Sequence, residues 1–527
     1  MKPRRMLWRG LTLTVVAGLT GTLLSVPAAG DDTETAAPEW GACPDGVATT
    51  VPLECATVPV PLDYDAPDGT QIDITISRVA STKPAARQGV LLTNPGGPGS
   101  AGLTMPADLV QRGIPSSVLD AYDVVGMDPR GVGHSAPVSC GFTLGQDYMG
   151  NIPPYAPDAA AVAEHAKTAE AVADQCAAND PEGRMQHMTT ANAARDMDRI
   201  RVALGEEKLS FFGASYGSGL GAAYASLFPE QGDRIVLDSN LGATSLDRDT
   251  QRRFGPGLED RFPDFAKWVA QRHGSYELGR TPKQVRAGYL ELADQLDRRP
   301  VAGLDGATFR FYTFVGLYSD GGFGTVAQIW QAAASGDTEA VRRQAQTLPS
   351  TTPGGPGAGA AVASPVAAPV ADGTQQPDAE VPAPADNAWS AYLAYACNDS
   401  EWPEDLATYQ RDVAADRKRY PLYGGAAANI NPCAYWHNDP AEPPVEIVDE
   451  GPQNVLVVQN LRDPGTPYLG GQLARKAFGD RAALVSVHDG GHGAYVYGGN
   501  ACALNTTTRY LVDGDLPKDT FCRPTAG

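Results

Sequence analysis

Short runs of apolar residues, many of them β-branched, recur from residue 89 onward and alternate with longer segments of mixed character. Six runs are apolar at almost every position, which is typical of strands buried on both faces of a parallel sheet. They span residues 89–94, 123–128, 209–213, 234–238, 454–459 and 483–487. Parallel strands need crossover helices, and helical patterns stand between these runs at residues 190–204 and 219–228. The chain is therefore predicted to be an α/β protein with a doubly wound, mostly parallel sheet.

The alternation breaks between residues 238 and 454, where the chain is mostly helical by pattern. The clearest helical patterns there span residues 260–273, 281–298 and 326–346. Strand-like runs resume only after residue 454, so we interpret the segment as an insertion that caps the carboxyl-terminal edge of the sheet. The predicted organisation is a first part of the core at 30–240, a helical cap at 241–445 and a second part of the core at 446–527.

Residues 349–386, within the cap, are rich in Pro, Ala, Gly and Thr and lack hydrophobic periodicity. This composition predicts a disordered loop or linker. The alternative, that the tract joins two independent domains, is disfavoured because the sheet is interrupted before it rather than finished.

The start of the chain is basic and is followed by an apolar run at residues 11–26 and by the small residues Ala28 and Ala29. This order is typical of a secretory signal peptide, and we predict that residues 1–29 are removed. An uncleaved anchor is the alternative, although the apolar run is short for a spanning helix. The expected location is extracellular or at the cell wall, and the pair Arg4-Arg5 does not decide between the general secretory and twin-arginine routes.

The predicted export affects the interpretation of the eight cysteines. An even number of cysteines in an oxidising compartment indicates disulfides, and free buried thiols are the alternative. Eight cysteines allow about 105 pairings, among which the sequence does not choose. We expect neighbours to pair because each bond then closes a local loop: Cys43 with Cys55, Cys140 with Cys176, Cys397 with Cys433, and Cys502 with Cys522.

The charge of the chain narrows the class of partner. Its 527 residues hold 41 Lys and Arg against 62 Asp and Glu, a formal net charge of −21. An acidic surface repels phosphate backbones and anionic lipid heads, so neither nucleic acid nor stable membrane attachment is expected. The cysteines and histidines form no Cys-x-x-Cys or His-Glu-x-x-His motif, which disfavours a metal site.

Gly213-Ala-Ser-Tyr-Gly217 follows a predicted buried strand and precedes a helix of small residues. A nucleophile elbow requires this context, because its glycines let the backbone turn sharply and present the serine above the sheet. Ser215 is therefore the predicted nucleophile, and a serine in an ordinary turn is the alternative.

A serine hydroxyl needs a histidine as base and an acid that orients the histidine. In this type of fold the acid follows the serine along the chain, and the histidine follows the acid. Four histidines follow Ser215, and two of these lie after the last predicted strand. We predict His492, in the flexible loop Asp489-Gly-Gly-His-Gly493, as the base, because His488 ends the strand itself. Asp463, just past the penultimate strand, is the predicted acid, and Asp238 is the alternative.

Acyl transfer also needs hydrogen-bond donors for the developing oxyanion. Asn94-Pro-Gly-Gly-Pro-Gly99 follows the first buried strand, and its glycines expose backbone amides. We assign one donor to the amide of Gly97, with Gly96 as the alternative, and the second to the amide of Tyr216. An ordinary Gly/Pro turn is the competing interpretation.

Taken together, these motifs resemble those of the secreted actinobacterial tripeptidyl aminopeptidases, relatives of proline iminopeptidase in the α/β-hydrolase superfamily. The likeness extends from about residue 40 to residue 522 and rests on an ordered set: 94–99, Asp128-Pro-Arg-Gly-Val-Gly-His-Ser135, 213–217, Arg462-Asp463 and Gly491-His492. The resemblance implies a serine exopeptidase that removes short peptides, often tripeptides, from free N-termini. The tract 349–386 is longer and richer in Pro and Ala than the family leads us to expect.

An aminopeptidase must recognise an ammonium group, which a buried carboxylate does well. Cys397-Asn-Asp-Ser-Glu-Trp-Pro403 resembles the family's Cys-x-Asp-x-x-Trp-Pro segment. Asp399 and Glu401 are therefore candidates for binding the substrate N-terminus, with solvated loop acids as the alternative.

The sequence predicts hydrolysis through an acyl-enzyme without a metal or organic cofactor. A carboxylesterase or lipase with the same triad is the main rival, because fold does not decide substrate. A non-catalytic binding protein on this scaffold is the second.

Overall fold

A computed structural model describes residues 37–143, 146, 152–345 and 383–524. The predicted signal peptide and most of the tract 349–386 lie outside these residues. The described residues belong to one compact unit. Among the described helices, none combines the length and the apolar character needed to cross a membrane.

The described residues contain a nine-stranded sheet in the order β1-β2-β4-β3-β5-β6-β7-β8-β9. The first two strands pair antiparallel, β2 pairs antiparallel with β4, and all later pairings are parallel. The strands are β1 (Glu54–Pro61), β2 (Gln71–Val79), β3 (Gly89–Asn94), β4 (Tyr122–Met127), β5 (Leu209–Ala214), β6 (Gly232–Asp238), β7 (Val455–Arg462), β8 (Ala482–Gly490) and β9 (Thr520–Cys522). The predicted α/β class with a mostly parallel sheet is confirmed.

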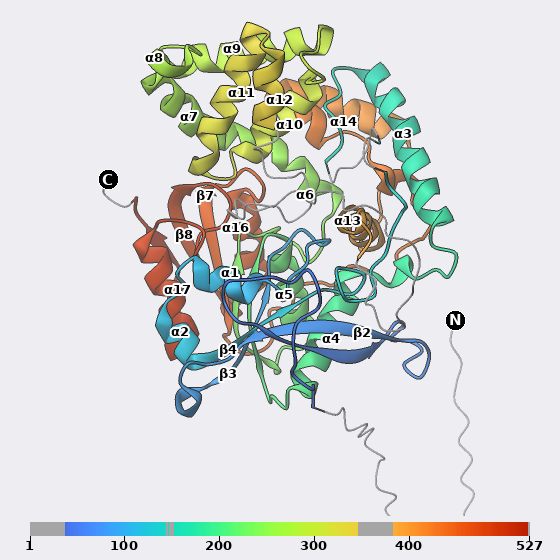
Figure 1. Ribbon diagram of the computed structural model, residues 1–527, viewed down its shortest axis with the longest axis vertical. Helices are drawn as coiled ribbons and strands as arrows, with labels where there is room; N and C mark the ends of the chain where they lie inside the picture. Colours follow the sequence, from blue (N-terminus) through green and yellow to red (C-terminus); the bar gives the residue numbers. More distant parts are fainter. Residues whose placement is uncertain (1–36, 144–145, 147–151, 346–382, 525–527) are drawn as a thin grey trace, which may run out of the picture. The chain divides into compact units, whose positions relative to one another are not determined.

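Helices cover both faces of this sheet (Figure 1). Adjacent residues of β3 point to opposite faces: Leu92 packs with the helices α4 (Thr190–Ala203) and α5 (Tyr216–Leu227), whereas Leu91 packs with α1 (Met105–Gln111) and α2 (Ser116–Ala121). The face of α4 and α5 also receives α16 (Tyr468–Ala477), and the other face receives α17 (Ala501–Asp513). Burial of the sheet on both faces explains why most positions of the central strands are apolar.

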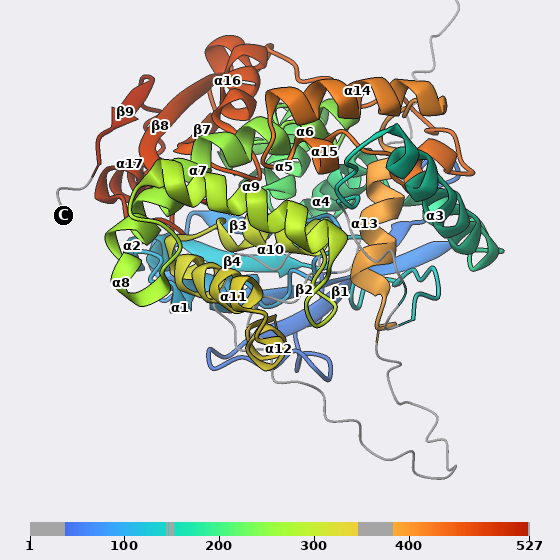
Figure 2. The ribbon, with the colours of Figure 1, turned by 90° about the horizontal axis from the view of Figure 1, so that it is seen from above.

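A mainly helical segment separates β6 from β7. It contains α6 (Arg248–Arg252), α7 (Phe254–Gln271), α8 (His273–Tyr276), α9 (Pro282–Arg298), α10 (Gly306–Gly316), η3 (Asp320–Gly322), α11 (Phe323–Ser335), α12 (Thr338–Ala345), α13 (Asn387–Asn398), α14 (Leu406–Arg419), α15 (Gly424–Ala427) and η4 (Pro432–Tyr435). Helices α7, α9, α10 and α11 share a hydrophobic cluster of their own, built around Phe262, Tyr289 and Trp330. In Figure 2, α7 and α10 are seen in front of the strands of the sheet.

The helix predicted at residues 326–346 is instead two helices, α11 and α12. Gly336 separates them with φ +72°, a left-handed conformation that ends a helix readily in glycine. The proposed bounds of core and cap, at 240 and 445, remain a prediction.

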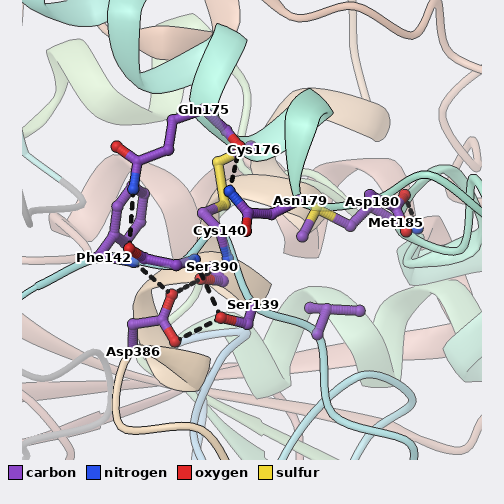
Figure 3. The surroundings of a disulfide bond; sticks show 12 residues. Ser139, Cys140, Phe142, Gln175, Cys176, Asn179, Asp180, Met185, Asp386 and Ser390 are labelled. Carbon is purple, nitrogen blue, oxygen red and sulfur yellow. Dashed lines mark hydrogen bonds between the residues drawn. A yellow bond between two sulfur atoms is a disulfide. The ribbon is translucent and has the colours of Figure 1, made fainter.

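The four disulfides join the cysteine pairs predicted from the sequence: Cys43–Cys55, Cys140–Cys176, Cys397–Cys433 and Cys502–Cys522. Cys140–Cys176 ties the segment after β4 to α3 (Ala159–Ala178). Figure 3 shows that the start of α13 is anchored beside this bond. Asp386 accepts hydrogen bonds from the hydroxyls of Ser139 (2.7 Å) and Ser390 (2.9 Å), and Ser390 accepts one from the amide of Cys140 (2.8 Å).

The first turn of α13 also rests on the loop that follows β3. A Cβ atom on Gly99 would collide with the carbonyl of Ala388, so only glycine permits this approach. The side chain of Asn387 donates to the carbonyls of Gly131 and Val138 (both 2.8 Å) and accepts from the amide of Gly133 (2.9 Å). Helix α13 is therefore fixed against the loops at the carboxyl ends of β3 and β4.

Candidate active site

The predicted site residues follow strands that are neighbours in the sheet. Strands β3, β5, β6, β7 and β8 are adjacent and parallel, so their carboxyl ends share one edge. Loops at this edge carry the binding and catalytic groups of open α/β sheets.

Ser215 stands between β5 and α5 with φ 59° and ψ −125°. This conformation is strained for a residue with a side chain and matches a nucleophile elbow. The glycines on either side allow the turn to be tight. A Cβ atom on Gly213 would collide with the carbonyl of Gly217, and one on Gly217 would lie 2.6 Å from the carbonyl oxygen of Asn94. The local sequence thus explains the sharp turn on which the partly buried serine stands.

The glycine-rich loop after β3 lies directly against this elbow. A Cβ atom on Gly96 would be 2.8 Å from the Cβ of Ser215 and 3.1 Å from the amide nitrogen of Tyr216. The amide of Gly96 already donates to the side chain of Asn94 (3.0 Å). Gly97, with φ 37°, therefore remains the better proposal for the oxyanion donor, together with Tyr216.

His492 and Asp463 form a direct pair. Nδ1 of His492 lies 3.0 Å from both carboxylate oxygens of Asp463, which is almost completely buried. Burial by itself would lower the pKa of His492, but the charge and hydrogen bond of Asp463, supported by the charge of Asp238, raise it above its usual value. An Nδ1 engaged in this way leaves Nε2 as the nitrogen available to a serine hydroxyl.

The carboxylate of Asp463 is itself held by its own turn. It accepts hydrogen bonds from the amides of Gly465 and Thr466 (both 2.9 Å) and from the hydroxyl of Thr466 (2.8 Å). The hydroxyl of Thr466 also lies 3.3 Å from Nδ1 of His492. Thr466 was not predicted from the sequence, although a threonine three residues after an aspartate is a familiar local hydrogen-bonding pattern.

Asp238, the alternative acid, has a different position. Its fully buried carboxylate accepts hydrogen bonds from the amides of Ala494 (2.9 and 3.0 Å) and Tyr495 (2.8 Å). The neighbouring hydroxyl of Ser239 accepts one from the amide of Gly493 (2.8 Å). Burial raises the pKa of Asp238 to about 6, because these hydrogen bonds offset desolvation only in part. The geometry favours Asp463 as the acid and makes Asp238 the anchor of the loop that carries His492.

His488 lies within β8, and its ring faces Phe521 at 6.2 Å between ring centroids. Among the described residues, no group of three or more His, Cys, Asp or Glu side chains is arranged to hold a metal ion.

The two candidate residues for substrate N-terminus binding differ in environment. Asp399 is 6% exposed and accepts hydrogen bonds from the amide (2.7 Å) and hydroxyl (2.5 Å) of Thr190. The hydroxyl of Thr190 is in turn 2.7 Å from the phenol of Tyr216. Burial raises the pKa of Asp399 to about 7. Glu401 is exposed to solvent.

Asp399 lines a small pocket, with Thr190, Thr244, Ser245 and Glu442 among its other walls. The carboxylate of Glu442 is paired with Arg195 at 2.6 Å and 2.8 Å. Asp399 thus lies beside this pocket. The influences on its pKa are burial, hydrogen bonds from Thr190 and the charge of Glu442, and they include no neighbouring cation.

An elbow serine beside a glycine loop and a buried Asp–His pair, at one edge of a mostly parallel sheet, defines a serine hydrolase of the α/β-hydrolase class. Family models support this assignment: residues 89–305 match the alpha/beta hydrolase fold, and residues 420–522 match TAP-like protein. The chain is 33% identical to the tripeptidyl aminopeptidase of Streptomyces coelicolor, over 94% of this chain and 87% of that protein. The chain belongs to the tripeptidyl aminopeptidase family of α/β hydrolases.

Two mycobacterial relatives broaden this comparison. Serine protease Hip1 of Mycobacterium tuberculosis is 28% identical, over 88% of this chain and 86% of that protein. Carboxylesterase B of the same organism is 30% identical, over 92% of this chain and 90% of that protein. Relatives of similar identity thus carry both peptidase and esterase names.

Proposed function

We propose that this serine hydrolase is a secreted exopeptidase that removes short peptides, in the first instance tripeptides, from free N-termini. The observation that carries the proposal is the Asp463–His492 pair at the same edge of the sheet as the elbow of Ser215, in a chain similar along most of its length to a tripeptidyl aminopeptidase.

The proposed reaction uses the described groups in two stages. His492 removes the proton from Ser215 Oγ, which attacks the substrate carbonyl, while Asp463 orients the imidazole and stabilises the imidazolium. The amides of Gly97 and Tyr216 hold the oxyanion, each contributing about 3–4 kcal/mol to transition-state stabilisation. His492 then gives its proton to the leaving amine. In the second stage His492 removes a proton from water, which attacks the acyl-enzyme, and returns this proton to Ser215 Oγ as the acyl fragment is released.

Asp399 is the better candidate for binding the substrate ammonium group. Its carboxylate is buried beside a pocket, and pairing with an incoming ammonium would offset its desolvation. One tyrosine side chain and one hydroxyl separate it from the amide of Tyr216. The competing explanation is purely structural, because Asp399 also caps the first turn of α4 through Thr190.

Glu401 is the weaker candidate because its side chain is exposed. A solvated carboxylate pairs weakly with an ammonium group, since water competes for both partners.

A pair of anilide substrates tests the requirement for a free amine. We expect cleavage of an Ala-Pro-Ala anilide and a much lower kcat/KM for its N-acetylated form. Equal rates would overturn the aminopeptidase proposal. The variant Asp399→Asn should raise KM for the free-amine substrate and leave the slow rate with the acetylated one unchanged, and Glu401→Gln is the matched control.

A carboxylesterase is the second candidate function, supported by the 30% identical carboxylesterase of Mycobacterium tuberculosis. The same triad cleaves esters, so the discriminating measurement compares kcat/KM for a short-chain p-nitrophenyl ester with that for the tripeptide anilide. A preference for the ester together with indifference to N-acetylation would favour the esterase.

Secretion is part of the proposal and is supported by the four disulfides, which form in oxidising compartments. Expression of the full chain and of a form lacking residues 2–29, followed by comparison of medium, envelope and cytoplasm, tests it. Retention of the full chain in the cytoplasm would contradict it.

A further inference from the structure

We infer that Tyr318, a residue of the cap, is a positioning residue for His492, so that the cap forms one wall of the triad. The inference rests on the proposed catalytic role of His492 and is independent of which substrate the enzyme cleaves.

Tyr318 holds both the backbone and the ring of His492. It lies between α10 and η3, and its carbonyl accepts a hydrogen bond from the amide of His492 (2.7 Å). Its ring centroid is 4.9 Å from that of the imidazole, with the ring planes at 63°. An edge-to-face contact of this kind restricts rotation of the imidazole about its side-chain bonds.

Glycines on two core loops permit this close approach. A Cβ atom on Gly491, which has φ +104°, would lie 2.7 Å from the carbonyl oxygen of Tyr318. A Cβ atom on Gly465, two residues after Asp463, would lie 2.5 Å from the phenol oxygen of Tyr318. Tyr318 is thus wedged between the loop that carries the acid and the loop that carries the base.

An ion-pair network fixes the cap segment around Tyr318. The guanidinium of Arg261, buried in α7, donates to the carbonyl of Leu317 (3.0 Å) and pairs with Asp320 and with Asp264 (2.9 Å). Asp264 also accepts from Arg462 at 2.7 Å, and Arg462 is the residue before Asp463. Cap and core are therefore joined by charged groups on both sides of the Tyr318 contact.

The groups that face His492 determine how removal of the Tyr318 ring would change the pKa of the imidazole. Asp463 from the loop after β7 and Asp238 from the end of β6 both raise the pKa of His492, while burial lowers it. Tyr318 supplies the neighbouring ring from the cap. Removal of this ring admits water to the imidazole, which weakens the desolvation and raises the pKa of His492. It also frees the imidazole to rotate away from Ser215.

The test measures the rate at which a fluorophosphonate probe labels Ser215, since this reaction needs the triad but no peptide-binding contacts. The variants are Tyr318→Ala, Tyr318→Phe and, as a matched control, Tyr312→Ala, which removes a partly buried ring from α10 that packs on Phe311. We expect Tyr318→Ala to slow labelling at least about tenfold, since small misplacements of a catalytic group reduce rates by up to about 10²-fold. The acidic limb of the labelling rate plotted against pH should move to higher pH in Tyr318→Ala. Tyr318→Phe and Tyr312→Ala should resemble the wild type.

Wild-type labelling and an unchanged pH profile in Tyr318→Ala would overturn the inference. If this variant does not fold, Tyr318→Leu, which retains apolar volume without an aromatic edge, takes its place under the same criteria. His492→Ala is measured in parallel. Unimpaired labelling of His492→Ala would overturn the proposed triad and the inference together, whereas impaired His492→Ala with normal Tyr318 variants would overturn the inference alone.

Discussion

Asp238 accepts hydrogen bonds from the amides of Ala494 and Tyr495, the second and third residues after His492. A carboxylate at the end of β6 thus holds the loop after β8, although the nearer partner of the imidazole is Asp463. From the sequence, either aspartate could have been the acid that contacts the histidine. In the structure Asp463 contacts the imidazole of His492, and Asp238 holds the loop that carries His492.

Replacement of the acid in the pair tests its assignment. We expect Asp463→Asn to lower kcat about 10³–10⁴-fold, because an amide does not stabilise the imidazolium or the required tautomer. Loss of the negative charge also removes the largest favourable influence on the pKa of His492. The acidic limb of kcat/KM against pH should therefore move to lower pH in any residual activity. A variant within tenfold of wild type would refute the assignment.

The pH dependence of stability should reveal the buried carboxylate of Asp238. Its folded pKa is about 6, above the value of about 3.9 for an unfolded aspartate, so the folded state binds more protons between these values. Its contribution to stability is therefore lost as pH rises through about 6. Asp238→Asn should remove a decrease of roughly 2–3 kcal/mol in the free energy of unfolding between about pH 4 and pH 7. Chemical denaturation of the wild type and of Asp238→Asn at several pH values measures this difference. The prediction is contradicted if the free energies of unfolding of the two proteins depend on pH in the same way.

Thr466 should matter for catalysis more than for folding. Thr466→Val keeps the shape of the side chain but removes the hydroxyl that donates to Asp463. Loss of one hydrogen bond to a charged group corresponds to about 1.5–3 kcal/mol, so we expect kcat to fall about 10–100-fold. Thr466→Ser should restore most of the activity. Equal loss in both variants would indicate disrupted packing instead.

The disulfide between Cys140 and Cys176 should stabilise the enzyme without contributing directly to the chemistry. It closes a loop with a sequence separation of 36 residues. Its removal in Cys140→Ala/Cys176→Ala should lower the free energy of unfolding by about 3–4 kcal/mol, mainly by enlarging the unfolded ensemble. Thermal denaturation measures this loss, and kcat at low temperature should stay within twofold of wild type. A large loss of kcat would instead indicate that anchoring of α13 reaches the active site.

The central strands were accessible to sequence reasoning because burial on both faces leaves nearly continuous apolar runs. Strands β1 and β2 were missed because they pair antiparallel at the margin of the sheet, where exposed and buried positions mix and prolines occur. Strand β9 has three residues, too few for any periodic signal. The break between α11 and α12 was also missed, although Gly336 is a residue type that commonly ends a helix in the left-handed conformation.

Some residues of the candidate site could be predicted from the sequence, and others could not. Ser215, Asp463 and His492 carry local motifs, so their predicted positions depend on short stretches of chain. Tyr318 carries no such motif, because its relation to His492 is created only when the cap packs on the core. The burial of Asp399 and the exposure of Glu401, two residues apart, likewise depend on how α13 meets α4 rather than on residue type.

The insertion of the cap between β6 and β7 has a consequence during biosynthesis. A nascent polypeptide that has emerged as far as residue 454 contains the nucleophile but lacks both partners proposed to activate it, which follow β7 and β8. Hydrolytic power would arise only once the last strands have joined the sheet. The order of the elements along the chain therefore delays assembly of the proposed triad until the last part of the protein has been synthesised.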